Sequence, residues 1–166
     1  YEYADTHQDF YIHDICYEAA DYGLERWSDP FYWNMYKYAM CVPAIPYTAF
    51  QLARIIKSIF GRNKKVLNLD LDNTLWGGVI GDDGPENIEI GQETSLGQTY
   101  AEFQDYLKQH KKLGVLLSVN SKNNEDTALS GLERADSVLK REDFVAFRAN
   151  WEPKSHNLYA TAEELK

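Results

Sequence analysis

Residues 66–74 read VLNLDLDNT, and this stretch decides the fold class that the sequence predicts. A short apolar run bounded by polar residues indicates a strand buried in a sheet, and this run ends in Asp70 and Asp72. Residues two apart in an extended segment point to the same side, at a separation of about 6.6 Å. The two carboxylates are therefore expected to face one ligand together.

Helices and strands are predicted to alternate after this run. The pattern predicts a helix over about 96–112, a strand at 115–120, a helix over 124–134, a strand around 144–147 and a helix beginning near Pro153. Strands that alternate with helices indicate the α/β class, with a parallel sheet and helices on both of its faces.

A dense turn signal, GDDGP at 81–85, lies between two short apolar pairs, Val79–Ile80 and Ile88–Ile90. Two apolar segments joined by such a turn predict a β-hairpin, here a small flap over 76–91. The two aspartates of the turn are interpreted as turn formers, with metal binding as the alternative.

The N-terminal part has a different composition, because 14 of the 23 aromatic residues fall in residues 1–50. We therefore expect two segments, an N-terminal helical and aromatic segment at 1–61 and an α/β segment at 62–166. Within the first, Thr48 and Gln51 form a capping-box pattern ahead of a helix over about 49–60, and 41–46 reads as a linker or turn. The aromatic stretch 25–40 is predicted to be a helix, with its rings in the core or against a neighbouring domain.

Composition excludes several classes of protein. Lys and Arg number 17 against 26 Asp and Glu, so the formal charge is −9, which disfavours nucleic acid as a partner. No apolar run reaches the roughly 20 residues of a membrane helix, and the first residues lack a signal-peptide pattern. Two cysteines without a metal-binding spacing favour a reducing, cytoplasmic location.

Polar residues follow each predicted strand. Asp70, Asp72 and Thr74 follow the first, Ser121 follows the second, and Lys154 stands at the start of the last helix. Ligands of open α/β sheets bind at the C-terminal ends of the strands. Together these residues offer a nucleophile, an acid or base, a hydroxyl donor and a cation, which suits phosphoryl transfer.

Each of these residues also has a plainer interpretation. Asp70 and Asp72 could be turn-forming carboxylates, Ser121 a turn or capping hydroxyl, and Lys154 an exposed residue at a helix start. Only their combination favours a binding site.

The order D-x-D-x-T after an apolar strand, then Ser at the next strand end, then Lys, resembles the haloacid dehalogenase superfamily of aspartyl-phosphate phosphotransferases. The resemblance implies a Rossmann-like core with Asp70 as the nucleophile and Asp72 as the general acid and base. It also implies that Thr74 stabilises the phosphate-binding loop, that Ser121 binds phosphoryl oxygens and that Lys154 neutralises them. The cofactor would be Mg²⁺, bound by oxygens such as the Asp70 carboxylate and the Asp72 carbonyl, and the substrate a phosphorylated small molecule.

Three stretches, LDLDNTLWGGVIGDDG at 69–84, SKN at 121–123 and FRANWEPKSHNL at 147–158, resemble the FkbH-like proteins, subfamily IIIC of that superfamily. This narrower resemblance covers about residues 15–166. It implies a role in polyketide biosynthesis, in which a glyceryl unit is dephosphorylated and loaded onto an acyl carrier protein. Residues 1–61 resemble the stretch that joins an upstream SGNH-hydrolase-like domain to this core.

Two departures from the family pattern limit these expectations. The chain ends about 12 residues after Lys154, before the acidic pair that should supply a further magnesium ligand, so it is expected to be a truncated piece with weak or no activity. Many FkbH-like proteins have Cys where Asn120 stands here, which leaves glyceryl transfer less well supported than phosphatase chemistry. The alternative function is a non-catalytic module that docks a carrier protein.

Overall fold

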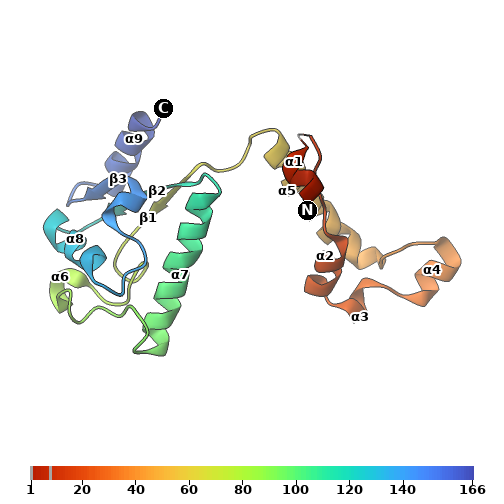
Figure 1. Cartoon of the computed structure of the whole chain (residues 1–166), viewed down its shortest axis with the longest axis horizontal. Helices are drawn as coiled ribbons and strands as arrows, with labels where there is room; N and C mark the ends of the chain where they lie inside the picture. Colours follow the sequence, from red (N-terminus) through yellow and green to blue (C-terminus); the bar gives the residue numbers. More distant parts are fainter. Residues whose placement is uncertain (1, 8) are drawn as a thin grey trace. The chain divides into compact units, whose positions relative to one another are not determined.

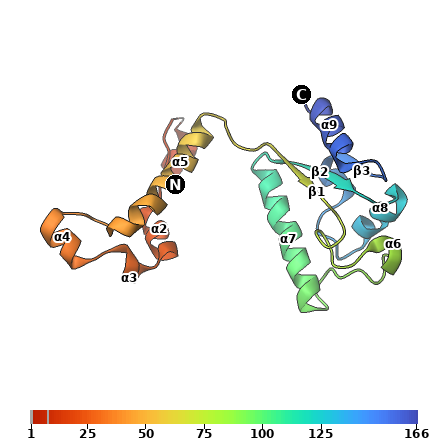
Figure 2. The same cartoon turned by 180° about the vertical axis from the view of Figure 1, so that it is seen from behind.

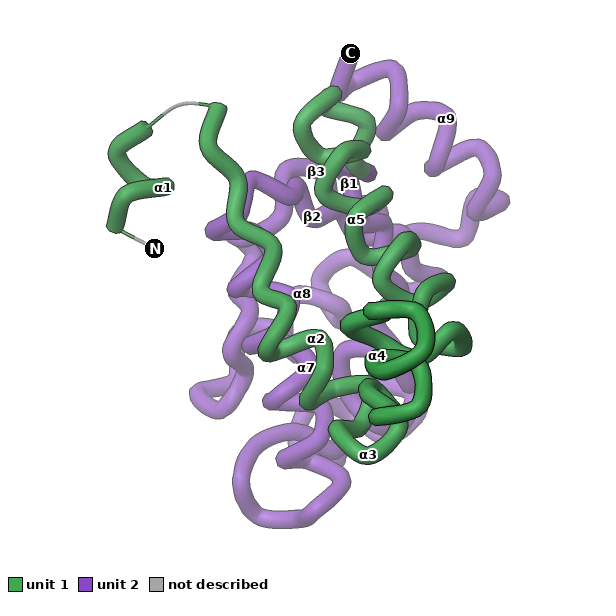
Figure 3. The backbone as a smooth tube through the Cα atoms, turned by 90° about the vertical axis from the view of Figure 1, so that its right-hand side faces the viewer, with its two compact units in different colours: residues 1–63 green, residues 64–166 purple. Residues whose placement is uncertain are grey.

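The computed structural model describes residues 2–7 and 9–166, and the chain divides into two compact units. Unit 1 comprises Tyr1–Asn63 and unit 2 comprises Lys64–Lys166 (Figure 3). Each unit has its own cluster of buried residues, so each is described by itself.

Unit 1 is built from short helices around a small core. Ala19, Trp27 and Ala44 are buried together, with Tyr22 and Tyr47 packed against them. The helical elements of the unit are α1 (Glu2–Thr6), α2 (Ile15–Tyr22), α3 (Leu24–Trp27), α4 (Pro30–Tyr36), the 3-10 helix η1 (Val42–Ala44) and α5 (Ile45–Ile59).

The prediction of a single helix over 25–40 is wrong, because the stretch is divided between α3 and α4. The carboxylate of Asp29 accepts a hydrogen bond from the Phe31 N–H at 2.8 Å, and Pro30 occupies the first turn of α4. Both features start a new helix at this point. Within unit 1 Trp27 is buried, whereas Phe31 and Trp33 are exposed.

The helix expected over 49–60 begins earlier, at Ile45, and the expected capping box does not form. Pro46 lies in the first turn of α5. Backbone N–H groups of the first turn have no acceptor within the helix, so the lack of an N–H in proline costs no hydrogen bond there. The Thr48 hydroxyl donates instead to the sulfur of Met40 at 3.6 Å. The stretch 41–46, expected to be a linker or turn, contains the 3-10 helix η1 and the beginning of α5.

Unit 2 is an α/β sheet structure, as the alternation of elements predicted. Its three strands pair in the order β1-β2-β3, and both pairings are parallel (Figures 1 and 2). The elements are β1 (Val66–Leu69), α6 (Ile80–Asp83), α7 (Ser95–Lys112), β2 (Leu116–Ser121), α8 (Glu125–Glu133), the 3-10 helix η2 (Arg141–Asp143), β3 (Phe144–Ala149) and α9 (Lys154–Glu164).

The central strand β2 shows which helices cover each face of the sheet. Leu117 and Val119 belong to the apolar cluster that also contains Leu107 of α7 and Leu132 of α8. Alternate residues of a strand point to opposite faces, so the side chain of Asn120 points the other way. Asn120 donates a hydrogen bond into α9. Helices α7 and α8 therefore cover one face of the sheet and α9 covers the other.

The prediction of a β-hairpin flap over 76–91 is wrong. The short helix α6 takes the place of the hairpin turn, and the two arms meet at an isolated antiparallel bridge between Gly77 and Glu89. That bridge has two backbone hydrogen bonds, of 2.9 and 3.0 Å, and it closes the segment into a compact loop.

Two carboxylates cause the helical turn of α6. Asp72 accepts a hydrogen bond from the Ile80 N–H at 3.1 Å, and Asp83 accepts one from the Val79 N–H at 2.8 Å. The first N–H groups of a helix have no intrahelical partner, so carboxylates placed there stabilise helix over strand. Gly84, which adopts a positive φ of 77°, then ends the helix.

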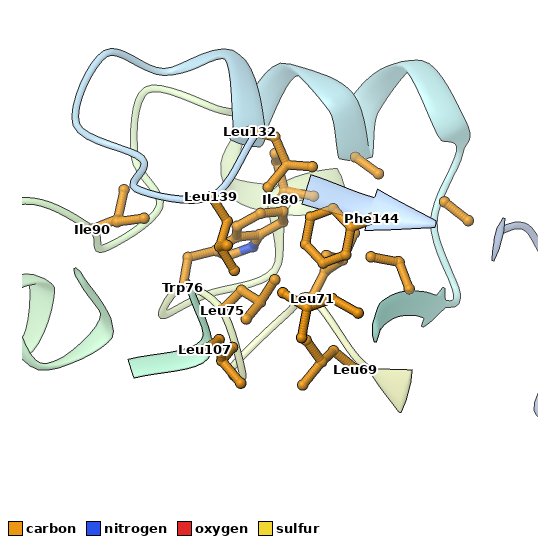
Figure 4. Packing of buried hydrophobic residues seen from close by; sticks show 14 of the residues in the cluster. Leu69, Leu71, Leu75, Trp76, Ile80, Ile90, Leu107, Leu132, Leu139 and Phe144 are labelled. Carbon is orange, nitrogen blue, oxygen red and sulfur yellow. The ribbon is translucent and has the colours of Figure 1, made fainter. Parts of the chain in front are cut away.

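The apolar cluster of unit 2 lies between the sheet, α7, α8 and the loop that carries α6 (Figure 4). Trp76, Leu71 and Leu75, which directly follow β1 and the Asp70 position, are completely buried in it. Burial of a side chain of this size stabilises the fold by about 1.5–3 kcal/mol. The turn after β1 is thus anchored by the core itself.

None of the helices in residues 2–7 and 9–166 has both the length and the hydrophobicity needed to cross a membrane.

Gly131 of α8 lies against the buried ring of Trp76, and it provides a test of this packing. A Cβ at position 131 would lie 2.8 Å from Ile80 Cδ1 and 2.9 Å from Trp76 Cη2. We expect Gly131→Ala to lower the free energy of unfolding by about 1–2 kcal/mol, because overpacking outweighs the better helix propensity of Ala. Guanidinium titration followed by tryptophan fluorescence measures the change.

The matched control is Gly81→Ala. A Cβ at position 81 would meet Asn123 Oδ1 at 3.8 Å, an ordinary contact distance. This variant should stay within about 0.5 kcal/mol of the wild type. Equal stability of the two variants would contradict the packing described for α8.

Candidate functional site

The sheet brings Asp70, Ser121 and Lys154 to one edge. Asp70 directly follows β1, Ser121 is the last residue of β2, and Lys154 begins α9 shortly after β3 ends at Ala149. Because the strands are parallel and in register, their C-terminal ends meet at the same edge. The sequence alone led us to expect this convergence.

Asp70 is the residue on which the contacts converge. Its Oδ2 accepts a hydrogen bond and ion pair from the Lys154 ammonium, and the Ser121 hydroxyl helps to lower the pKa of its carboxyl. Its Oδ1 accepts the Leu71 N–H at 2.9 Å. The side chains of Asp70 and Lys154 are 39% and 43% exposed, so the pair is open to solvent.

These contacts set the protonation of Asp70. Burial alone would raise the pKa of this carboxyl, but hydrogen bonds from Lys154, Ser121 and the Leu71 N–H, together with the Lys154 charge, outweigh it. The net result is a pKa below the ordinary value of 3.8. Asp70 is therefore ionised at neutral pH, as a nucleophilic carboxylate must be.

Three hydrogen bonds hold the side chain of Asp72 in a fixed orientation. Its Oδ1 accepts hydrogen bonds from the Trp76 indole N–H at 3.0 Å and the Ile80 N–H at 3.1 Å, and its Oδ2 accepts one from the Asn123 amide at 2.8 Å. A carboxylate has about four acceptor positions. Three are used, which leaves one on Oδ2 for a proton or a water molecule.

Thr74 lies in the turn after Asp72, where its N–H donates to the Leu71 carbonyl at 3.1 Å. Among the described residues, the Thr74 hydroxyl makes no hydrogen bond to the side chains of the other predicted site residues, Asp70, Asp72, Ser121 and Lys154. Asn73 adopts a positive φ of 53°, a conformation that Asn tolerates better than most residues, and its Oδ1 accepts the Gly78 N–H at 3.1 Å.

Asn123 is a residue of the site that the sequence analysis did not identify. One side-chain amide donates to Asp72 Oδ2 at 2.8 Å and to Ser121 Oγ at 3.3 Å, and the residue is buried. It thereby links the Asp72 carboxylate to the Ser121 hydroxyl. The SKN motif contained the signal, since a short amide two residues after a strand-end Ser can reach the same edge.

A second group of amides fixes the start of α9, and the sequence analysis missed it too. Asn120 donates to the Lys154 carbonyl at 2.9 Å and accepts from the Asn157 amide at 3.2 Å. Asn157 also donates to Asn150 Oδ1 at 2.8 Å. These bonds hold the backbone of Lys154 against β2, which positions its ammonium over Asp70.

The donor set of the site fits a magnesium ion. Mg²⁺ in proteins is usually bound by one or two carboxylates, with water and substrate phosphate completing its octahedron. Asp70 and Asp72 provide two carboxylates on one turn, and Asp70 is partly open to solvent. In the described part of the chain no group of three or more His, Cys, Asp or Glu side chains could enclose a metal, so most ligands would come from water and substrate.

The structure resembles a known crystal structure. The N-terminal part of the protein BF1531 from Bacteroides fragilis, described as containing a phosphatase domain complexed with Mg, matches it with a TM-score of 0.88 and 37% sequence identity. The match covers 99% of this chain and 44% of that chain, so this chain spans less than half of that structure. The sequence matches no family model and no curated protein.

Replacement of Lys154 by Met tests the electrostatics of Asp70. The change removes the hydrogen bond and the charge that lower the pKa, while burial, which raises it, remains. We expect the pKa of Asp70 to rise relative to the wild type, as measured by the pH titration of its carboxyl carbon in NMR spectra. Lys122→Met, which removes an exposed charge next to Ser121, is the control and should leave that titration nearly unchanged.

The same substitution has a consequence for stability. A carboxyl whose pKa is lowered by folding stabilises the fold above its unfolded pKa, and this contribution is lost as the pH falls through the folded pKa. The wild type should therefore lose stability as the pH falls below about 3.8, and Lys154→Met should lose less over that range. Identical acid titrations of the two proteins would contradict the assignment.

Proposed function

We propose that this chain carries the phosphoryl-transfer site of a Mg²⁺-dependent phosphatase of the haloacid dehalogenase type. The observation that carries the proposal is the Asp70 carboxylate at the sheet edge, paired with the Lys154 ammonium and lowered in pKa by Lys154 and the Ser121 hydroxyl. A carboxylate in contact with a cation and a hydroxyl donor suits the capture of a phosphoryl group. The likeness to a phosphatase-containing structure crystallised with Mg supports the same function.

The first step would be attack of an Asp70 oxygen on phosphorus. A bond forms between Asp70 and phosphorus while the bond from phosphorus to the leaving oxygen breaks, which gives an aspartyl phosphate. The Lys154 ammonium and the Ser121 hydroxyl would donate hydrogen bonds to the phosphoryl oxygens as negative charge develops on them. The Lys154 ammonium already donates a hydrogen bond to the attacking carboxylate, and Ser121 ends the neighbouring strand.

Asp72 would move the protons of both steps. Its remaining acceptor position on Oδ2 would hold the proton that passes to the leaving oxygen. In the second step the same oxygen would take a proton from water, whose oxygen attacks phosphorus and displaces Asp70. The products are orthophosphate and a free Asp70 carboxylate, and Asp72 is protonated again for the next substrate.

Magnesium would be held by the Asp70 carboxylate and by the Asp72 carbonyl. When bound, it supplies positive charge that offsets the repulsion between the carboxylate and the phosphate. The protein's own contribution is orientation, because Trp76, Ile80 and Asn123 hold Asp72 in place.

We also propose, on the three motifs quoted above, that the parent protein is FkbH-like. Its substrate would then be a phosphorylated three-carbon donor of a glyceryl unit, and an acyl carrier protein would be a partner. Asn120 argues against a thioester on this chain at that position, because its amide is buried and bonded to Lys154 and Asn157. Any transfer of the acyl unit to a carrier would have to proceed without a covalent intermediate at residue 120.

Substitution of Asp70 by Asn tests the catalytic proposal. We expect the Mg²⁺-dependent hydrolysis of an aryl phosphate by a longer natural chain to fall by at least about 1,000-fold, since the nucleophile is lost. Asp82→Asn, which makes the same chemical change at an exposed position of α6, should retain wild-type activity. Removal of Mg²⁺ should abolish the activity of both the wild type and Asp82→Asn.

The alternative function, a carrier-docking module without turnover, gives a different result. Rates would then be undetectable in every protein of the series, with or without Mg²⁺. Beryllium fluoride, a phosphoryl mimic, would also fail to attach to Asp70 in the longer chain. A measurable activity that survives Asp70→Asn would overturn the nucleophile assignment itself.

A further inference from the structure

Trp151 is a large apolar side chain that the structure leaves in solvent at the edge of the sheet that carries the site. It is 70% exposed, and it lies between β3 and α9, three residues before Lys154. A single exposed apolar residue is common in proteins and needs no function. Two contacts distinguish Trp151 from such a residue.

The first contact fixes the ring. The indole N–H of Trp151 donates to Asn124 Oδ1 at 3.0 Å, so the exposed ring is held from one edge with its faces free. A side chain that is already ordered loses less conformational entropy when a ligand packs against it. The indole is thus prepared for a contact that none of the described residues makes.

The second contact, between Asn123 and Asp72, ties the residue next to Asn124 to the phosphoryl site. The Asn123 amide donates to Asp72 Oδ2 at 2.8 Å. The adjacent side chains of Asn123 and Asn124 therefore bond to the Asp72 carboxylate and to the Trp151 indole. The Asn150 N–H, which donates to the Ser121 carbonyl at 3.1 Å, ties the same segment to the second strand.

We propose that the Trp151 indole binds the leaving group of the substrate, so that the site favours phosphate monoesters whose leaving group presents a flat or apolar face. This inference rests on the proposed phosphatase function and adds a substrate class to it. Asp70, Ser121 and Lys154 are polar and serve the phosphoryl group, whereas Trp151 supplies apolar area to the part of the substrate that is released. Contact between an aromatic ring and such a group favours binding through dispersion and burial of apolar surface.

Binding of two non-hydrolysable phosphonates tests the inference. Benzylphosphonate and ethylphosphonate both present a phosphonate group to the site, and only the first has a ring. With Mg²⁺ present, we expect isothermal titration calorimetry to show that the wild type binds benzylphosphonate about fivefold more tightly than ethylphosphonate. In Trp151→Ala this preference should disappear, while the affinity for ethylphosphonate stays the same.

Tyr106→Ala is the matched control, because Tyr106 is another exposed aromatic residue of unit 2, 57% exposed, and it lies in the second half of α7. It should keep the wild-type preference. If ethylphosphonate binds but the preference is absent, or survives Trp151→Ala, the inference is overturned and the phosphoryl site stands. If the wild type binds neither phosphonate, the phosphoryl site itself is wrong and the inference falls with it.

Discussion

The contact between Lys154 and Asp70 joins two residues that are 84 positions apart, and the candidate site depends on it. A half-exposed ion pair contributes no more than about 1 kcal/mol to stability, so this contact does not hold the fold together. The buried cluster around Trp76 and Leu71 does that, with several side chains that each contribute more. The fold is therefore the cause of the ion pair, and the ion pair brings two opposite charges to the place where a phosphoryl group would lie.

Asp72 connects the site to the loop that covers part of the core. The same carboxylate accepts hydrogen bonds from the indole N–H of buried Trp76 and from the first N–H of α6, and it accepts a third from Asn123, which follows β2. Two of these donors lie in the loop after β1, and the third lies in the turn after β2. The geometry of the acid and base therefore depends on the packing of the core and of the α6 loop together.

The sequence predicted the architecture well where the pattern was long and regular. The alternation of apolar runs and amphipathic helices predicted all three strands and their parallel order, and α7 begins within a residue of its expected start. Its N-cap is Thr94, whose hydroxyl accepts a hydrogen bond from the Gly97 N–H. The roles assigned to Asp70, Asp72, Thr74, Ser121 and Lys154 stay predictions.

The errors came from contacts that sequence patterns do not contain. The turn-rich segment at 81–85 indicated a hairpin, but carboxylates of Asp72 and Asp83 bind the N–H groups that start a helix. Asn123 was missed because its importance lies in reaching Asp72, 51 residues away. Local propensity cannot reveal a partner so distant along the chain.

The way in which α9 is fastened has a mechanical consequence. An apolar interface lets a helix slide by small amounts at little cost, because dispersion contacts are not directional. The amides of Asn120, Asn150 and Asn157 instead form directional bonds, and displacement of α9 along its axis would break them together. Helix α9 is therefore fixed along its own axis. The Lys154 ammonium at its N-terminal end keeps a constant position relative to the sheet.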